Sequence, residues 1–154
     1  MYRFQKTQCP RLENHENNEL MSIIMYKLPE NFDLNFLLGC FLEMVCFGPN
    51  MTRLEFTRPE KSIGEEPYRV VICVEGPLYY QIKAQRVARN HSDSSTCAPL
   101  IDFVLHNVAL VEQIGLSSLK ILFDNSNYIE FIADEDAEFE SYSIYLNSGE
   151  VIVV

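Results

Sequence analysis

Residues suited to nucleophilic chemistry gather in one polar stretch, 85–99. His91, Asp93 and Cys97 lie close together there, and a thiol with a neighbouring imidazole and carboxylate has the groups of a nucleophile, its base and an orienting acid. The stretch is also rich in serine, so its polar composition alone accounts for these residues, and no family motif surrounds Cys97. We therefore treat His91, Asp93 and Cys97 as an alternative site and not as the main one.

The sequence lacks the residue spacings and motifs that mark several common metal, catalytic and nucleotide sites. No two histidines lie four residues apart as in a zinc-binding helix, and no two cysteines are separated by two residues. Cys40 and Cys46 are an even number of residues apart, so on a regular strand they would share one face, and we expect that face to be buried. Neither a Gly-x-Ser-x-Gly nor a Gly-x-Gly-x-x-Gly motif occurs. We therefore predict no metal, no cofactor and no catalytic residues.

Charge is distributed unevenly along the 154 residues. The chain has 12 Lys and Arg against 22 Asp and Glu, a net charge of −10, and no Lys or Arg follows Lys120. This argues against binding to nucleic-acid phosphates or to anionic membranes. It favours a surface that attracts a basic protein partner, with a solvated acidic face that aids solubility as the alternative. The candidate contact residues are Asp134, Glu135, Asp136, Glu138 and Glu140.

Two tyrosines follow this acidic run. Tyrosine is common at interface hot spots, so we add Tyr142 and Tyr145 as candidate aromatic anchors. The alternative for Glu140-Ser141-Tyr142 is structural, with Ser141 in a turn and Tyr142 facing the core.

Short apolar runs separated by turn residues predict β-strands through most of the chain. Residues 51–57 alternate between apolar and polar, as in a half-buried strand, and residues 68–75 are rich in valine and isoleucine, as in a central strand. Residues 119–123 and 128–132 flank a polar turn and predict a hairpin. Further strands are expected at 40–47, 78–82, 108–114, 142–146 and 151–154.

The connections are predicted from their turn residues. Gly76-Pro77 predicts a turn from which residues 78–82 run back along the preceding strand. Residues 85–99 predict a long polar loop. Residues 99–106 predict a short helix, because proline stands at its start.

A faint internal repeat occurs at an offset of 67 residues, where Leu54 aligns with Ile121 and Phe56 with Phe123. The repeat predicts two copies of one β unit, with chance similarity between two hairpins as the alternative. The predicted fold class is mainly β (α+β). We expect an antiparallel sheet, folded as a sandwich or half-barrel, with one or two short helices.

Residues 1–20 are polar, and we interpret them as a flexible tail or an over-long gene prediction that precedes a single β-rich domain, 21–154. The N-terminus lacks the apolar run of a signal peptide. No window reaches the about 18 apolar residues of a membrane span. The five cysteines, an odd number at irregular spacing, favour reduced thiols and a cytoplasmic location.

The C-terminal part resembles a group of small uncharacterised bacterial proteins. The similarity lies in residues 119–125, 128–131 and 139–144, where a hairpin precedes an acidic stretch and a Glu-Ser-Tyr step, and in the closing apolar strand. Residues 37–45 are similar to the opening strand of that group. Such proteins often look like immunity proteins of bacterial toxin systems, which bind and block a cognate toxin. The resemblance implies no catalytic residues.

These observations predict a non-enzymatic cytoplasmic binding protein. It would be an immunity-type inhibitor that contacts a basic protein, such as a toxin, through its acidic C-terminal surface. The alternative is a small-molecule-binding or enzymatic β fold, with a cavity inside the sheet or a site near residues 85–99. A homodimer that pairs exposed sheet edges such as 151–154 is a third interpretation.

Overall fold

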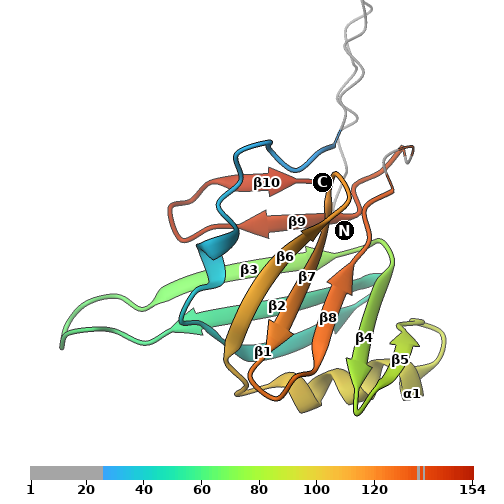
Figure 1. Cartoon of the computed structure of the whole chain (residues 1–154), viewed down its shortest axis with the longest axis horizontal. Coiled ribbons are helices and arrows are strands. Elements are labelled where there is room, and N and C mark those ends of the chain that lie inside the picture. The colour runs from blue at the N-terminus through green and yellow to red at the C-terminus, as the bar shows by residue number, and fades with distance from the viewer. Residues whose placement is uncertain (1–25, 135, 137) are drawn as a thin grey trace, which may run out of the picture.

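The computed structural model describes residues 26–134, 136 and 138–154 (Figure 1). The predictions made for residues 1–20, for a domain start at Met21 and for Glu135 lie outside the described residues. Within the described residues, no helix has the length and apolar character needed to cross a membrane.

The described chain folds into two antiparallel sheets of five strands each, so the prediction of a mainly β fold is confirmed. Sheet A has the order β1-β2-β3-β9-β10, and sheet B has the order β5-β4-β8-β7-β6. In Figure 1, sheet B lies in front of sheet A, and its strands cross those of sheet A at a steep angle. The strands are β1 (Phe41–Gly48), β2 (Met51–Arg58), β3 (Tyr68–Val74), β4 (Leu78–Ile82), β5 (Gln85–Ala88), β6 (Val108–Ile114), β7 (Ser118–Phe123), β8 (Tyr128–Phe131), β9 (Tyr142–Tyr145) and β10 (Val151–Val153).

The two halves of the chain follow the same path. Each half begins with a 3-10 helix, η1 (Leu34–Leu37) or η2 (Ala98–Phe103), and continues through five strands. In each half, the first three strands form one side of a sheet, and the last two strands cross over to complete the other half's sheet. The predicted repeat therefore corresponds to two equivalent β units that exchange their last hairpins.

The opening hairpins of the two units match in detail. Leu42 pairs with Phe56 in β1–β2, and Val108 pairs with Phe123 in β6–β7. Each pairing is followed by a shift of register, so a bulge occupies the same place in both hairpins. In β1 the bulge reverses the alternation of faces, so Cys40 is buried but Cys46 lies half-buried on the outer face. The expectation that these two cysteines share a buried face is therefore wrong.

One continuous core lies between the two sheets. Apart from Thr52 on β2, the inward residues of the central strands are apolar, and large aromatic rings occupy the centre. The Phe103 and Phe123 rings have centroids 5.1 Å apart, and the Phe131 and Tyr142 rings 5.6 Å. These rings occupy the centre of the core, where the alternative interpretation of the sequence placed a ligand cavity. That alternative is therefore not supported.

Two predicted connections differ from the structure. Gly76-Pro77 does not close a hairpin, because β3 and β4 belong to different sheets. The expected loop 85–99 contains β5, a single-turn helix α1 (Ser94–Cys97) and the start of η2. The helix expected over 99–106 is present as η2, a 3-10 helix that buries Leu100 and Phe103.

Candidate protein-binding site

Two crossing connections build the corner at which the acidic residues lie. The chain passes from sheet A to sheet B at Glu75–Pro77 and returns from β8 to β9 through residues 132–141. The backbone oxygen of Ser141 accepts hydrogen bonds from the N–H groups of Glu75 (3.1 Å) and Gly76 (2.8 Å). The N–H of Ile132 donates to the oxygen of Pro77 at 3.0 Å. The two connections therefore hold each other in place.

The approach of these chains requires glycine at position 76. A Cβ atom there would lie 3.0 Å from Cα and 3.1 Å from the backbone oxygen of Ser141. Ser141 itself is buried, and its hydroxyl accepts a hydrogen bond from the N–H of Asp134 at 3.1 Å. This contact fixes where the acidic segment begins.

Carboxylates gather around one exposed aromatic ring at this corner. Asp134, Asp136 and Glu138 are exposed, Glu140 is half-buried, and the Phe139 side chain is 76% exposed. None of these four carboxylates forms an ion pair among the described residues. A groove of about 360 Å³ runs beside them. We name this site the acidic corner; it comprises Glu75, Asp134, Asp136, Glu138, Phe139 and Glu140.

The two tyrosines proposed as anchors have different positions. Tyr142 is 0% exposed, and its hydroxyl donates a hydrogen bond to the backbone oxygen of Ser117. Burial raises the pKa of Tyr142 far above its usual value. Tyr142 therefore belongs to the core and cannot act as a surface anchor. Tyr145 is 44% exposed, on the outer face of sheet A.

Sequence reasoning missed Phe139. The residue stands in an acidic segment without alternation, so no period indicated whether its ring faces inward or outward. The only signal was the presence of one large apolar side chain among five carboxylates.

The alternative site is only partly assembled. His91 and Cys97 both line a surface groove of about 520 Å³, next to the β1–β2 turn at Pro49. Asp93 instead caps α1, where its carboxylate accepts from the N–H (3.0 Å) and the hydroxyl (2.7 Å) of Ser95. No hydrogen bond joins His91 to either Cys97 or Asp93 in the described part of the chain. The combination of thiol, base and orienting acid considered as the alternative site is therefore not formed.

The state of His91 fits a neutral imidazole. Burial, and then the neighbouring Arg89, lower the pKa of His91 below its usual value. Its Nε2 atom is buried, and no described atom hydrogen-bonds to it. Cys97 makes only a weak contact, with Sγ 3.5 Å from the oxygen of Asn90.

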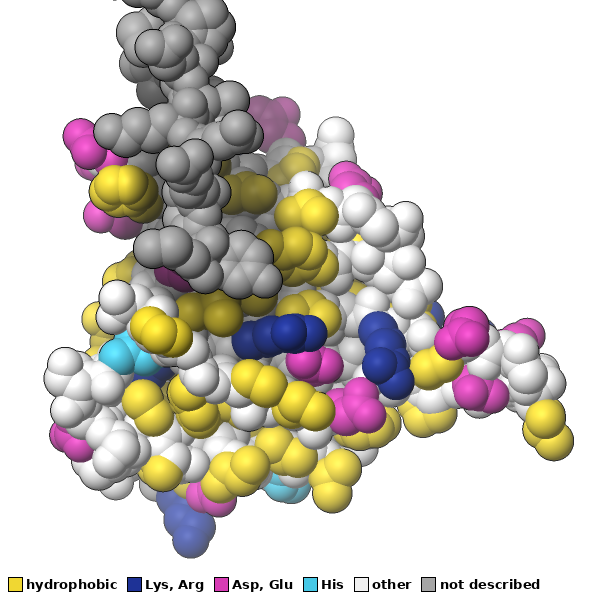
Figure 2. All heavy atoms as spheres, turned by 180° about the vertical axis from the view of Figure 1, so that it is seen from behind, with side chains coloured by type: hydrophobic (Ala, Val, Ile, Leu, Met, Phe, Trp, Pro, Cys, Tyr) yellow, Lys and Arg dark blue, Asp and Glu magenta, His cyan; other side chains and the backbone are white. Residues whose placement is uncertain are grey.

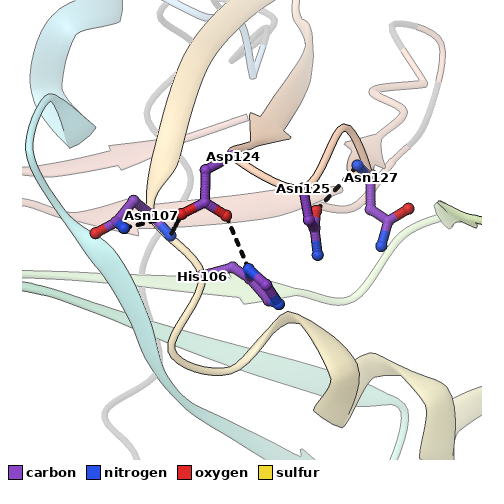
Figure 3. A network of polar contacts seen from close by, with 5 residues as sticks. All are labelled: His106, Asn107, Asp124, Asn125 and Asn127. Atoms are coloured by element: carbon purple, nitrogen blue, oxygen red, sulfur yellow. Dashed lines mark hydrogen bonds and ion pairs between the residues drawn. The ribbon is translucent and has the colours of Figure 1, made fainter.

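A second polar network, not predicted from the sequence, joins the start of β6 to the end of β7 (Figure 3). Nδ1 of His106 lies 2.8 Å from Oδ1 of Asp124, and Oδ2 of Asp124 accepts from the backbone and side-chain N–H groups of Asn107 at 3.1 and 2.9 Å. The hydrogen bonds from Asn107, and then the one with His106, lower the pKa of Asp124. No described serine, threonine or cysteine side chain bonds to this pair, so the network fastens the hairpin and contains no nucleophile.

Within residues 26–134, 136 and 138–154, no three His, Cys, Asp or Glu side chains converge in a way that could hold a metal ion. No family model, no curated protein and no solved structure matches this chain.

Proposed function

We propose that this protein is a non-enzymatic binding protein that contacts a basic protein partner through the acidic corner. The observation that carries the proposal is Phe139, 76% exposed among carboxylates that form no ion pair within the described residues. A solvated acidic loop needs no aromatic ring, because its solubility comes from the charges alone. An exposed ring surrounded by charges of one sign is a common arrangement of an interface anchor with its polar rim.

The chemistry of the partner follows from these groups. An arginine or lysine side chain can place its cation near a carboxylate and its apolar stem on the face of the Phe139 ring. The hydrogen-bonded crossover of Gly76 and Ser141 forms part of the groove wall, so the groove does not have to be built on binding, which lowers the entropic cost of association. The net charge of −10 would also attract a basic partner over distance and speed its association.

The finer proposal is that the partner is a toxin and that binding blocks it. It rests on the resemblance of the C-terminal part to immunity-type proteins and on the charge of the acidic corner. Enzymes that act on nucleic acids have basic active sites that receive phosphates, and grouped carboxylates can occupy the same positions.

A binding experiment with matched variants tests the proposal. The full chain serves as bait in lysate of the source cells at low salt, and each captured basic protein is purified and titrated against wild type. We expect Phe139→Ser to raise the Kd about 30-fold or more, as for a hot-spot residue. The triple change Asp134→Ser, Asp136→Ser and Glu138→Ser should weaken binding similarly and reduce its dependence on salt.

The loop between β2 and β3 supplies the control. Changing Glu60, Glu65 and Glu66 together to Ser removes the same charge from three other exposed positions. If this control weakens binding as much as the acidic-corner variants do, general charge explains the attraction and the proposal is wrong. Inhibition of the captured protein's own activity by wild type, but not by Phe139→Ser, would support the toxin-blocking role.

A second candidate is small-molecule binding in the groove next to the β1–β2 turn. The specific observation is the buried, unpaired Nε2 of His91 in the loop that lines a groove of about 520 Å³. A thermal-shift screen of small polar metabolites, repeated with His91→Ala, tests this candidate. A ligand that stabilises wild type and not the variant would support it.

A further inference from the structure

The outer face of sheet A carries apolar or thiol side chains on four of its five strands, β1, β3, β9 and β10, and charged ones on β2. Figure 2 views the molecule from this side, and hydrophobic side chains surround a few charged ones. Met44, Tyr145 and Val151 are 46%, 44% and 48% exposed. Two neighbouring rows of outward side chains are Met44-Glu55-Val71-Tyr145-Val151 and Cys46-Arg53-Cys73-Ser143-Val153. A third row beside the first is polar, because Thr57 pairs with Arg69 there and the Thr57 hydroxyl donates a hydrogen bond to the Glu43 carboxylate.

Sheet B provides a comparison within the same molecule. Because the two β units are equivalent, each position on the outer face of sheet A has a counterpart on the outer face of sheet B. Its rows are Leu110-Leu122-Tyr128-Gln81-Arg86 and Glu112-Lys120-Glu130-Tyr79-Ala88.

Charged side chains pair with one another or stack on aromatic rings across this second face. Arg86 pairs with Glu130 at 2.9 Å and stacks on the Tyr79 ring, and Lys120 stacks on the ring of Tyr128. Sheet B thus has the arrangement of a solvated face.

Three of the charged positions of sheet B are apolar or thiol in sheet A. Cys46, Cys73 and Val151 stand where Glu112, Glu130 and Arg86 stand in the other unit. One fold thus carries two outer faces of different chemistry. Since a solvated face does not require this difference, the apolar face of sheet A has the composition of a contact surface.

The charges within the two apolar rows point to the occupant. Arg53 and Glu55 are two positions apart on β2, near the middle of the face, and form an ion pair of 2.8 Å. A two-fold axis that crosses the strands at the level of Leu54 would place Arg53 opposite Glu55 of the partner subunit, and the reverse pair beside it. Such a pattern is complementary to itself, which is the requirement of an isologous interface.

We propose that the outer face of sheet A binds a second copy of this chain. In a chain with a net charge of −10, these two rows carry one positive and one negative charge, so two copies can meet here without bringing acids together. Five strands about 4.8 Å apart give a face roughly 20 Å wide. A standard interface buries about 800 Å² per partner, so this face forms its centre and the neighbouring loops its rim.

Sedimentation or light scattering of the purified full chain, from about 1 μM to about 1 mM, tests the proposal. We expect a monomer–dimer equilibrium. Replacing Met44 and Tyr145 with Lys should weaken the dimer about 100-fold or more, because each interface would then bury four unpaired cations. The matched control replaces the equivalent Leu110 and Gln81 with Lys, and it should leave the dimer unchanged; Leu110 is 47% exposed.

The ion pair provides a test specific to a two-fold dimer. Arg53→Glu places four acids at the axis and should prevent association. The double change Arg53→Glu with Glu55→Arg restores complementarity and should restore the dimer. Circular dichroism of every variant checks that it is folded.

Three results would overturn the proposal. The first is a monomer throughout the concentration range. The second is a dimer that survives lysine at Met44 and Tyr145, which would place the contact elsewhere, for example at the edge of β10. The third is a dimer that the sheet B control weakens equally, because general charge would then be responsible.

Discussion

At the scale of single residues, Tyr142 shows what a buried hydroxyl contributes. Its hydroxyl donates a hydrogen bond to the backbone oxygen of Ser117, and the Ser117 hydroxyl accepts one from the N–H of Leu28 at 3.2 Å. These groups are buried, so each depends on its partner in place of water. The Tyr142 hydroxyl therefore links β9 to the β6–β7 turn and, through Ser117, to the segment that precedes η1.

We expect Tyr142→Phe to lower the free energy of unfolding by about 1–3 kcal/mol at pH 7, because the Ser117 oxygen loses its donor without gaining water. Urea denaturation measures the change. The control is Tyr145→Phe, whose ring is 44% exposed, and it should change stability by less than about 0.5 kcal/mol. Equal values for the two variants would contradict the role given to the buried hydroxyl.

The contribution of Tyr142 to stability should also depend on pH in the alkaline range. The pKa of Tyr142 is raised above its usual value of 10.0 by burial, so the folded protein keeps the hydroxyl neutral after the unfolded chain begins to ionise. Its contribution is complete below pH 10 and decreases as pH rises toward the folded pKa. The stability difference between wild type and Tyr142→Phe should therefore shrink above about pH 10. A difference that stays constant to pH 11 would contradict this.

The position of Tyr142 could be predicted from the sequence, but that of Phe139 could not. Tyr142 and Ile144 are two residues apart and so share a face of a strand, whereas Tyr145 lies on the other face. The apolar character of Ile144 marked that face as the buried one. Phe139 lies in a connection, and its exposure depends on how two chain segments cross at Gly76, which is a long-range property.

At the scale of elements, the crossover between Gly76 and Ser141 joins the two sheets and positions the acidic corner. Gly76→Ala would bring a methyl group to 3.0 Å from backbone atoms of Ser141. The two segments would have to separate, which would weaken the hydrogen bonds from Glu75 and Gly76 to the Ser141 oxygen.

We expect Gly76→Ala to destabilise the protein by about 1–3 kcal/mol, as overpacking does elsewhere. Gly48→Ala is the control, because its Cβ would meet only the end of Met51 at 3.5 Å. Thermal unfolding of both variants measures the effect. The model of a tight crossover fails if Gly76→Ala is as stable as Gly48→Ala. Partner binding at the acidic corner should weaken only in Gly76→Ala.

Strands could be predicted from the sequence more reliably than their pairing. Alternation identified β2, and the turn at Asp124–Asn127 identified the β7–β8 hairpin, because both signals are local. Gly76-Pro77 indicates that the chain turns, but not that β4 pairs with β8 in the other sheet. The strand β5 was missed because its side chains are mostly exposed and its pairing with β4 depends on backbone groups.

At the scale of the whole molecule, neither half of the chain can complete a sheet alone. Sheet A needs β9 and β10 from the second half, and sheet B needs β4 and β5 from the first half. Alone, each half would expose the inner face of a three-stranded sheet together with an unpaired hairpin. The arrangement therefore stabilises the two halves jointly and makes unfolding a single cooperative step.

A chain divided between Ser92 and Asp93, in the exposed segment before α1, tests this description. We expect fragments 1–92 and 93–154 to associate one to one when expressed together, with a circular dichroism spectrum close to that of the whole chain. Separately, each should lack cooperative unfolding. The division breaks only local contacts, such as those between Asn90 and Thr96.

The outcome also distinguishes two descriptions of the fold. If fragment 93–154 folds cooperatively by itself, its three strands β6–β8 form a stable unit, and the exchange of hairpins is secondary. If it folds only with fragment 1–92, the exchanged hairpins supply an essential part of the common core, since Tyr80 on β4 and Tyr142 on β9 are both buried in it. Fragment 93–154 with Tyr142→Ala should then bind fragment 1–92 at least about 30-fold more weakly, because the change removes a large buried ring from that cluster. The same fragment with Tyr145→Ala is the matched control and should bind nearly as wild type does.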